Sequence, residues 1–100
     1  MIEIAHVTGF DWDAGNERKS VEKHDVSQAE AEQVFFNYPL LLLQDARHSN
    51  METRFHALGT TNGGRQLHIT FTLRREKTLV RVISARDMHR KERLAYDQDA

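Results

Sequence analysis

The sequence contains no cysteine, only one proline and no long apolar run. Without cysteine, disulfide bonds and cysteine-based zinc sites are excluded, and a reducing cytoplasm is the expected setting. The longest apolar run has four residues, Leu40 to Leu43, whereas a membrane-spanning helix needs about 20. The first residues also lack the charged and then apolar pattern of a secretory signal. These absences predict a cytoplasmic protein that has no membrane partner.

Patterns that would hold a metal ion or a nucleotide cofactor are also missing. None of the six histidines belongs to the His-Glu-x-x-His helix motif of metalloproteases. His56 and His68 could face each other across a hairpin, but no third ligand is apparent. The segment Asn62-Gly63-Gly64 is a turn and does not have the pattern of a phosphate-binding loop. We therefore expect no metal and no cofactor.

Charge is nearly balanced overall, with a formal net charge of −1, but it is unevenly distributed. Residues 1–50 contain four Lys or Arg and nine Asp or Glu, whereas residues 51–100 contain ten and six. Between Arg65 and Arg93, nine basic residues stand against three acidic ones. This split indicates a polyanionic partner on one side of the protein, although the solvated face of a mixed-charge protein has the same composition.

The first half of the chain predicts a short edge strand and two helices. Residues 2–7 alternate weakly, as an edge strand does. Asp13 is a good N-cap for a polar helix over residues 14–24. Ser27 and Glu30 have the spacing of a capping box, which begins a second helix. That helix must end near Asn37, because the proline at position 39 disfavours helical geometry at the residue before it.

The second half predicts strands over residues 40–44, 53–60, 66–73 and 79–85, followed by a helix over 88–96 capped by Asp87. The turn signal at residues 61–64 joins two of these strands as a hairpin. The element order is therefore β-α-α-β-β-β-β-α. This order predicts one α+β domain over residues 1–100, in which the helices cover one face of a small antiparallel sheet. Residues 97–100 are expected to fray.

Strand periodicity separates a core face from a polar face. The predicted core set is Phe55, Ala57, Leu67, Ile69, Phe71, Leu73, Val80 and Val82. The opposite face would collect Arg54, His56, His68, Thr70 and Arg81. Such a cationic surface suits a phosphate ligand, although polar residues are also expected on any solvent-facing side. Ile83 falls on the polar face, which indicates a bulge or a packing contact there.

Three blocks of the sequence form a recognisable pattern. The first is Phe10-Asp11-Trp12-Asp13 with Asn16, followed by Lys23 to Ser27, Glu30-Ala31 and Val34-Phe35. The second is His48 with Glu52 to Phe55 and Leu58-Gly59, and the third is Arg81 to Arg86 with Arg90 to Arg93 and Tyr96. Together these blocks resemble the BrnT toxin family. Asp25 and Ala14 depart from the family pattern, in which Gly and Pro are more usual. The match runs in order from about Phe10 to Tyr96.

This resemblance implies a RelE-like fold and an RNA-cleaving toxin. It also implies neutralisation by a BrnA-type antitoxin, a ribbon-helix-helix protein that binds DNA, in a complex within which the toxin tends to form a homodimer. Enzymes of the RelE-like class generally work without metal. In their reaction the ribose 2′-hydroxyl attacks the adjacent phosphorus in line and the 5′-oxygen leaves.

Charge stabilisation in this reaction is expected from three arginines, Arg54, Arg81 and Arg86. His56 or His68 is the candidate for proton transfer, with Glu52 or Tyr96 as a less favoured acid or base. The candidate RNA contacts are Arg65, Arg74, Arg75 and Lys91.

Structural roles compete with several of these assignments. Arg86 and Glu92 could pair with each other or cap the last helix, and Tyr96 could pack its ring on the core with its hydroxyl in water. At the level of the whole protein, the alternative is a catalytically inactive RelE-like module that binds RNA or protein.

Overall fold

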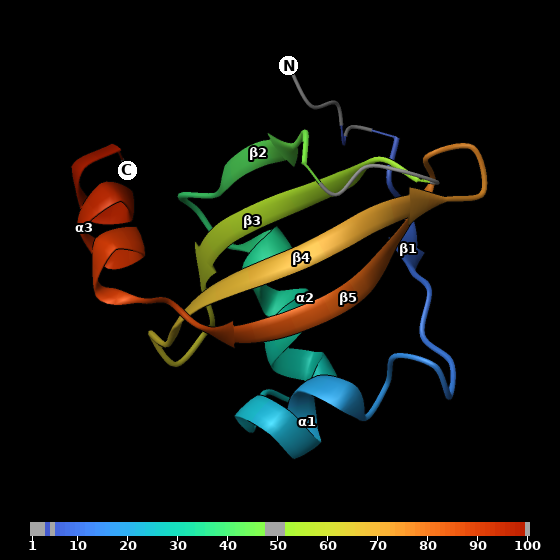
Figure 1. Ribbon diagram of the computed structural model, residues 1–100, viewed down its shortest axis with the longest axis horizontal. Coiled ribbons are helices and arrows are strands. Elements are labelled where there is room, and N and C mark those ends of the chain that lie inside the picture. Colours follow the sequence, from blue (N-terminus) through green and yellow to red (C-terminus); the bar gives the residue numbers. More distant parts are fainter. Residues whose placement is uncertain (1–3, 5, 48–51, 100) are drawn as a thin grey trace.

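The computed structural model describes residues 4, 6–47 and 52–99. In chain order its elements are β1 (Gly9–Phe10), α1 (Lys19–His24), α2 (Gln28–Phe36), β2 (Leu41–Asp45), β3 (Arg54–Thr60), β4 (Gln66–Arg74), β5 (Leu79–Asp87) and α3 (Arg90–Asp99). The strands form one sheet in the order β1-β5-β4-β3-β2 (Figure 1). The α+β class and the element order agree with the sequence prediction. Among the described residues, no helix has the length and apolar character needed to cross a bilayer.

The first strand lies later in the chain than predicted. Within the predicted range 2–7, the described residues Ile4, His6 and Val7 are outside any strand, and the remaining residues lie outside the described part. The observed β1 pairs parallel to the start of β5, through Gly9 with Leu79. The weak alternation was therefore misleading, and the pairing that forms depends on a partner 70 residues away.

Helix α1 is shorter than predicted because the residues after Asp13 form turns. Asp13 accepts the backbone N–H groups of Asn16 (3.1 Å) and Glu17 (2.9 Å) through its carbonyl oxygen. The buried Asn16 side chain donates to the carbonyls of Asp11 (3.0 Å) and Val82 (2.9 Å), which attaches this segment to β5. The first helical turns are thus replaced by a loop whose polar groups are satisfied by the sheet.

The capping box at the start of α2 forms as predicted. The Glu30 backbone N–H donates to Ser27 Oγ (3.1 Å), and the Ser27 N–H donates to Glu30 Oε1 (3.1 Å). Asp87 does not cap α3, because it is the last residue of β5 and pairs with Arg65. α3 continues to Asp99, three residues into the segment where fraying was expected.

The main core lies between the sheet and α2. Its buried residues are Val26, Ala31, Val34, Ala57, Leu67, Ile69, Phe71, Val80, Val82 and Ala85. Phe55 and Leu73 pack against them, so the predicted core face of the sheet is confirmed. Burying one such large side chain contributes about 1.5–3 kcal/mol.

The third helix packs on the other face of the sheet, which corrects the prediction that all helices share one face. Leu58 follows the core residue Ala57 and therefore points the opposite way. There it forms a separate buried cluster with Met88 and Tyr96 of the C-terminal segment. Figure 1 shows α2 behind the sheet and α1 below its β5 side, with α3 beyond one end of the strands.

Candidate active site

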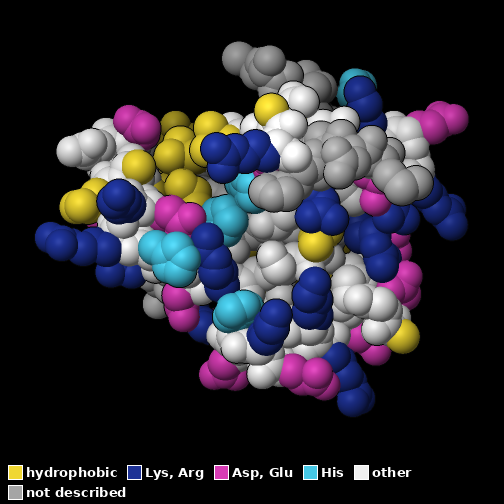
Figure 2. Space-filling model, in the orientation of Figure 1, with side chains coloured by type: hydrophobic (Ala, Val, Ile, Leu, Met, Phe, Trp, Pro, Cys, Tyr) yellow, Lys and Arg dark blue, Asp and Glu magenta, His cyan; other side chains and the backbone are white. Residues whose placement is uncertain are grey.

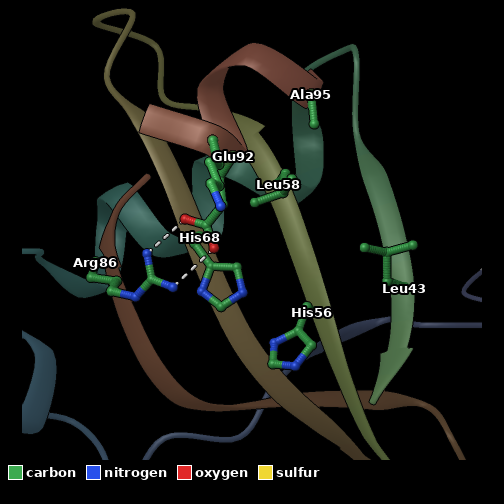
Figure 3. Close-up of a pocket in the computed structure, with 8 residues that line it drawn as sticks. Leu43, His56, Leu58, His68, Arg86, Glu92 and Ala95 are labelled. Carbon is green, nitrogen blue, oxygen red and sulfur yellow. Dashed lines mark hydrogen bonds and ion pairs between the residues drawn. The ribbon is translucent and has the colours of Figure 1, made fainter. Parts of the chain in front are cut away.

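A pocket of about 500 Å³ opens between α3 and the polar face of the sheet. It is lined by Leu43, His56, Leu58, His68, Arg86, Lys91, Glu92 and Ala95, so that four strands and α3 all contribute (Figure 3). In the face shown in Figure 2, His side chains lie among Lys and Arg and also Asp and Glu side chains, with hydrophobic side chains gathered on the α3 side. The lining of the pocket therefore combines apolar side chains with two histidines, two cations and one carboxylate.

The register of the sheet places three predicted residues in this pocket. His56 pairs with Thr70, Leu58 with His68, and His68 with Arg86. A bulge between Thr70 and Phe71 shifts the register against β5. Without this shift, strict alternation from Val80 and Val82 would turn Arg86 toward the core.

Hydrogen bonds fix the orientation of the His56 ring. Its Nε2 lies 2.9 Å from Asp45 Oδ2, and its Nδ1 lies 3.2 Å from Thr70 Oγ1. The ring stacks on His68 with centroids 4.8 Å apart and planes inclined by 25°. Because both nitrogens of His56 are engaged, His56 positions its neighbour, and His68 is the better placed of the two to meet a ligand.

His68 lies between His56 and Arg86, beneath Glu92 (Figure 3). Its buried Nδ1 has no hydrogen-bond partner among the described residues. Burial, reinforced by the positive charge of Arg86, lowers the pKa of His68 to about 4. The ring is therefore neutral at pH 7 and can accept a proton.

Arg86 and Glu92 form a two-pronged ion pair above His68. Arg86 Nη1 donates to Glu92 Oε1 (2.8 Å) and Nη2 donates to Oε2 (3.0 Å). Burial by itself raises the pKa of Glu92, but hydrogen bonds from Arg86 and the His89 backbone N–H outweigh it and bring this pKa to about 2. Two parallel N–H···O bonds are also the geometry with which arginine binds phosphate.

Arg81 does not reach the pocket, contrary to the predicted convergence of the arginines. Its Nη1 and Nη2 each donate to the carboxylate of Asp13 at 3.0 Å, and Nη1 lies 3.5 Å from Asp11. These bonds lower the pKa of Asp13. The guanidinium of Arg81 therefore attaches the segment after β1 to the sheet. Arg54 begins β3 in register with Thr72 and does not line the pocket.

The remaining predicted residues lie elsewhere. Arg65 donates to Asp87 (2.7 Å) and Glu30 (3.3 Å), and Arg74 donates to Glu52 (2.9 Å). The buried Tyr96 hydroxyl bonds to Thr60 Oγ1 (3.0 Å) and to the Pro39 carbonyl (2.6 Å). Arg75 lies in the β4–β5 turn, and its φ of 51° is left-handed. Lys91 alone of the four predicted RNA contacts lines the pocket.

Sequence reasoning missed Asp45 as a partner and gave Glu92 only a structural role. Asp45 lies at the end of β2 and meets His56 across a strand pair that no local pattern specifies. For Glu92, the only available signal was its spacing from Arg86. In the described part of the chain, no group of three His, Asp or Glu side chains is arranged to hold a metal ion.

Comparison with known proteins assigns the family. A family model described as ribonuclease toxin, BrnT, of type II toxin–antitoxin system matches residues 12–92. The matched range includes every residue of the pocket except Ala95. A search among curated proteins found no match. The match covers well over half of the chain and agrees with an α+β structure that holds a cationic, histidine-lined pocket, and the chain therefore belongs to the BrnT family of ribonuclease toxins of type II toxin–antitoxin systems.

Proposed function

We propose that the chain is an endoribonuclease that cleaves RNA in the α3 pocket by attack of a ribose 2′-hydroxyl on the adjacent phosphate, without a metal ion. The observation that carries this proposal is the placement of neutral His68 directly beside Arg86, with Lys91 at the same opening. A base next to fixed positive charge is what in-line attack on a phosphodiester requires.

Arg86 binds the scissile phosphate in this proposal. The Glu92 carboxylate occupies the guanidinium in the free protein, in the two-pronged manner that phosphate oxygens also adopt. RNA displaces Glu92, and Arg86 together with Lys91 then stabilises the charge that develops on the pentacoordinate phosphorus. A preorganised contact of this kind contributes about 3–4 kcal/mol to the transition state.

His68 takes the proton from the 2′-hydroxyl. The negative charge of the bound phosphate raises the pKa of His68 from its low value in the free protein, which makes it a more effective base. The bond between the 2′-oxygen and phosphorus forms as the bond to the 5′-oxygen breaks, and the Lys91 ammonium protonates the departing oxygen. The products are a 2′,3′-cyclic phosphate and a 5′-hydroxyl. His56, fixed by Asp45, holds the His68 ring in place.

RNA flanking the cleaved bond lies on the basic face in this proposal, by which we mean the face of the sheet that holds the α3 pocket and carries the Lys and Arg side chains seen in Figure 2. Arg75 is a contact there. Arg65, Arg74 and Arg81 are engaged with carboxylates, and we assign them to the stability of the fold. The partner that neutralises the toxin is a BrnA-type ribbon-helix-helix antitoxin, within whose complex two toxin chains pair. The reaction takes place in the cytoplasm.

The test is cleavage of RNA by the purified chain in EDTA, with analysis of the fragment ends. We expect fragments with 2′,3′-cyclic phosphate ends, which disappear in His68→Gln. His24→Gln is the matched control, because His24 is exposed on α1. RNA binding without fragments would favour the inactive module, and loss of cleavage in EDTA would establish a metal requirement.

A further inference from the structure

A second hollow, polar and open, lies at the end of the sheet where the α2–β2 link meets the β3–β4 turn. It has a volume of about 400 Å³ and is lined by Asn37, Tyr38, Thr60, Thr61 and Asn62. None of these residues lines the pocket described above. The hollow therefore needs an explanation of its own.

The most exposed large side chain at this hollow is Tyr38, at 94%. The neighbouring Phe36 is 78% exposed, although its ring also meets Phe10 edge-on with centroids 6.0 Å apart. An aromatic ring this exposed contributes almost nothing to folding through burial. Exposed aromatic rings are instead the platforms on which proteins stack the bases of single-stranded nucleic acid.

Two side-chain amides line the same hollow as Tyr38 and are held by hydrogen bonds. Asn37 Nδ2 donates to the Thr60 carbonyl (2.8 Å) and to Asn62 Oδ1 (3.0 Å), and the Asn62 backbone N–H donates to Gln33 Oε1 (3.0 Å). Within the described part of the chain, Asn37 Oδ1 and Asn62 Nδ2 have no hydrogen-bond partner. A fixed acceptor and a fixed donor next to an aromatic ring match the polar edge and the flat face of a nucleobase.

The hollow and the pocket are adjacent along β3. His56, Leu58 and Thr60 alternate onto the same face of the sheet. Leu58 lines the pocket, and Thr60, about 7 Å further along the strand, lines the hollow. Tyr96 of α3 lies between them, packed with Leu58 and hydrogen-bonded to Thr60. The pocket and the hollow are therefore neighbours on one face of the sheet, separated by the side chain of Tyr96.

We infer that this hollow binds an unpaired nucleobase next to the cleaved bond, which stacks on Tyr38 while its edge meets the amides of Asn37 and Asn62. The inference rests on the proposed ribonuclease function and names its specificity site. The polar lining favours a base over an apolar segment of a protein partner, because an apolar segment would leave both amides unpaired.

The test uses short RNA substrates with one cleavable bond, in which each flanking position carries a base or is abasic. We expect Tyr38→Ala to lower kcat/KM about tenfold when the base is present and to have no effect on the abasic substrate. Tyr38→Phe retains the ring and should restore most of the activity. Val21→Ala, a change at an exposed apolar residue of α1, is the control and should match the wild type.

A parallel binding assay separates the failure of this inference from the failure of the proposed function. Oligonucleotides that carry the fluorescent base 2-aminopurine should be quenched on binding to the wild type but not to Tyr38→Ala. If nothing is cleaved but quenching depends on Tyr38, the hollow binds bases and the cleavage proposal fails. If cleavage is normal and Tyr38→Ala equals the wild type on every substrate, the inference is overturned. Loss of antitoxin affinity alone would also overturn it, because the occupant would be a protein.

Discussion

Two arginines of β5 have the same chemistry but different surroundings. Arg86 lies beside His68 at the pocket, whereas Arg81 is bound by Asp13 and Asp11 beside β1. We expect Arg86→Ala to reduce RNA cleavage about 100- to 1,000-fold, as the loss of one preorganised charge contact does, and also to lower Tm, because the half-buried Glu92 carboxylate loses its partner. Arg81→Ala should lower Tm and leave kcat nearly unchanged. Activity assays and thermal unfolding of both variants check this difference, and equal losses of activity would contradict it.

Acidification should weaken the fold through His68. Its pKa is about 4 in the folded protein and about 6.5 in the unfolded chain, which therefore binds the proton more readily. The part of the free energy of unfolding that depends on neutral His68 is fully present above pH 6.5 and is lost as the pH falls toward 4. Between pH 7 and 5 the wild type should lose more Tm than His68→Gln, since the lowered pKa of Glu92 keeps that carboxylate ionised in this range. A parallel decline in both proteins would show that His68 is not the cause.

For single residues, the sequence predicted which side chains share a face of the sheet, because alternation along a strand determines the face. It placed His56 and His68 on one face because their positions relative to core residues are local. It did not predict that Arg81 is held by Asp13, or that Asp45 meets His56, because these contacts join segments that only the folded chain brings together.

Among the elements, α3 supplies Glu92, the carboxylate that pairs with Arg86. Glu92→Gln retains an oxygen that can accept the His89 N–H but removes the negative charge that competes with phosphate. We expect KM for RNA to fall severalfold because the guanidinium becomes available to the substrate. Glu22→Gln, a change on the distant helix α1, is the control. An unchanged or higher KM in Glu92→Gln would show that the ion pair does not oppose RNA binding.

The contact between α2 and β3 depends on Gly59. A methyl group at this position would lie 2.6 Å from Val34 Cγ1, which is closer than packed atoms approach. Gly59→Ala should therefore destabilise the fold by about 1–3 kcal/mol and lower Tm by roughly 4–8 °C for each kcal/mol. Gly63→Ala is the matched control, since its added methyl group would meet only Thr61 Oγ1 at 3.9 Å. Equal Tm values for the two variants would contradict the predicted role of Gly59.

Elements defined by local signals were predicted well, and those defined by tertiary contacts were not. The capping box fixed the start of α2, and the turn at residues 61–64 fixed the β3–β4 hairpin. The face covered by α3 was not predicted. Leu58 is an apolar residue on the polar side of the sheet, but its partners in the second small core, Met88 and Tyr96, are distant in the sequence and join it only in the folded chain. The misfit of Ile83 did indicate the bulge, although alternation alone could not show which residues it would shift.

For the molecule as a whole, the basic face predicts competition between RNA and the antitoxin. We expect an excess of a BrnA-type antitoxin to raise the apparent Kd for an RNA made uncleavable by a 2′-deoxy group at the scissile position. The affinity of this RNA should also fall with salt, because phosphate contacts release counterions. Fluorescence anisotropy measures both effects. A stable complex of toxin, antitoxin and RNA would show that the antitoxin binds away from this face.

The bulge in β5 divides one nine-residue strand into two halves whose arginine side chains have different surroundings. The half that contains Arg81 secures the N-terminal segment, and the half that contains Arg86 faces the proposed substrate. In the second half only Arg86 lines the pocket, since Ala85 is buried in the core and Asp87 binds Arg65. The extra residue therefore lets one strand both anchor the N-terminal segment and form a wall of the pocket.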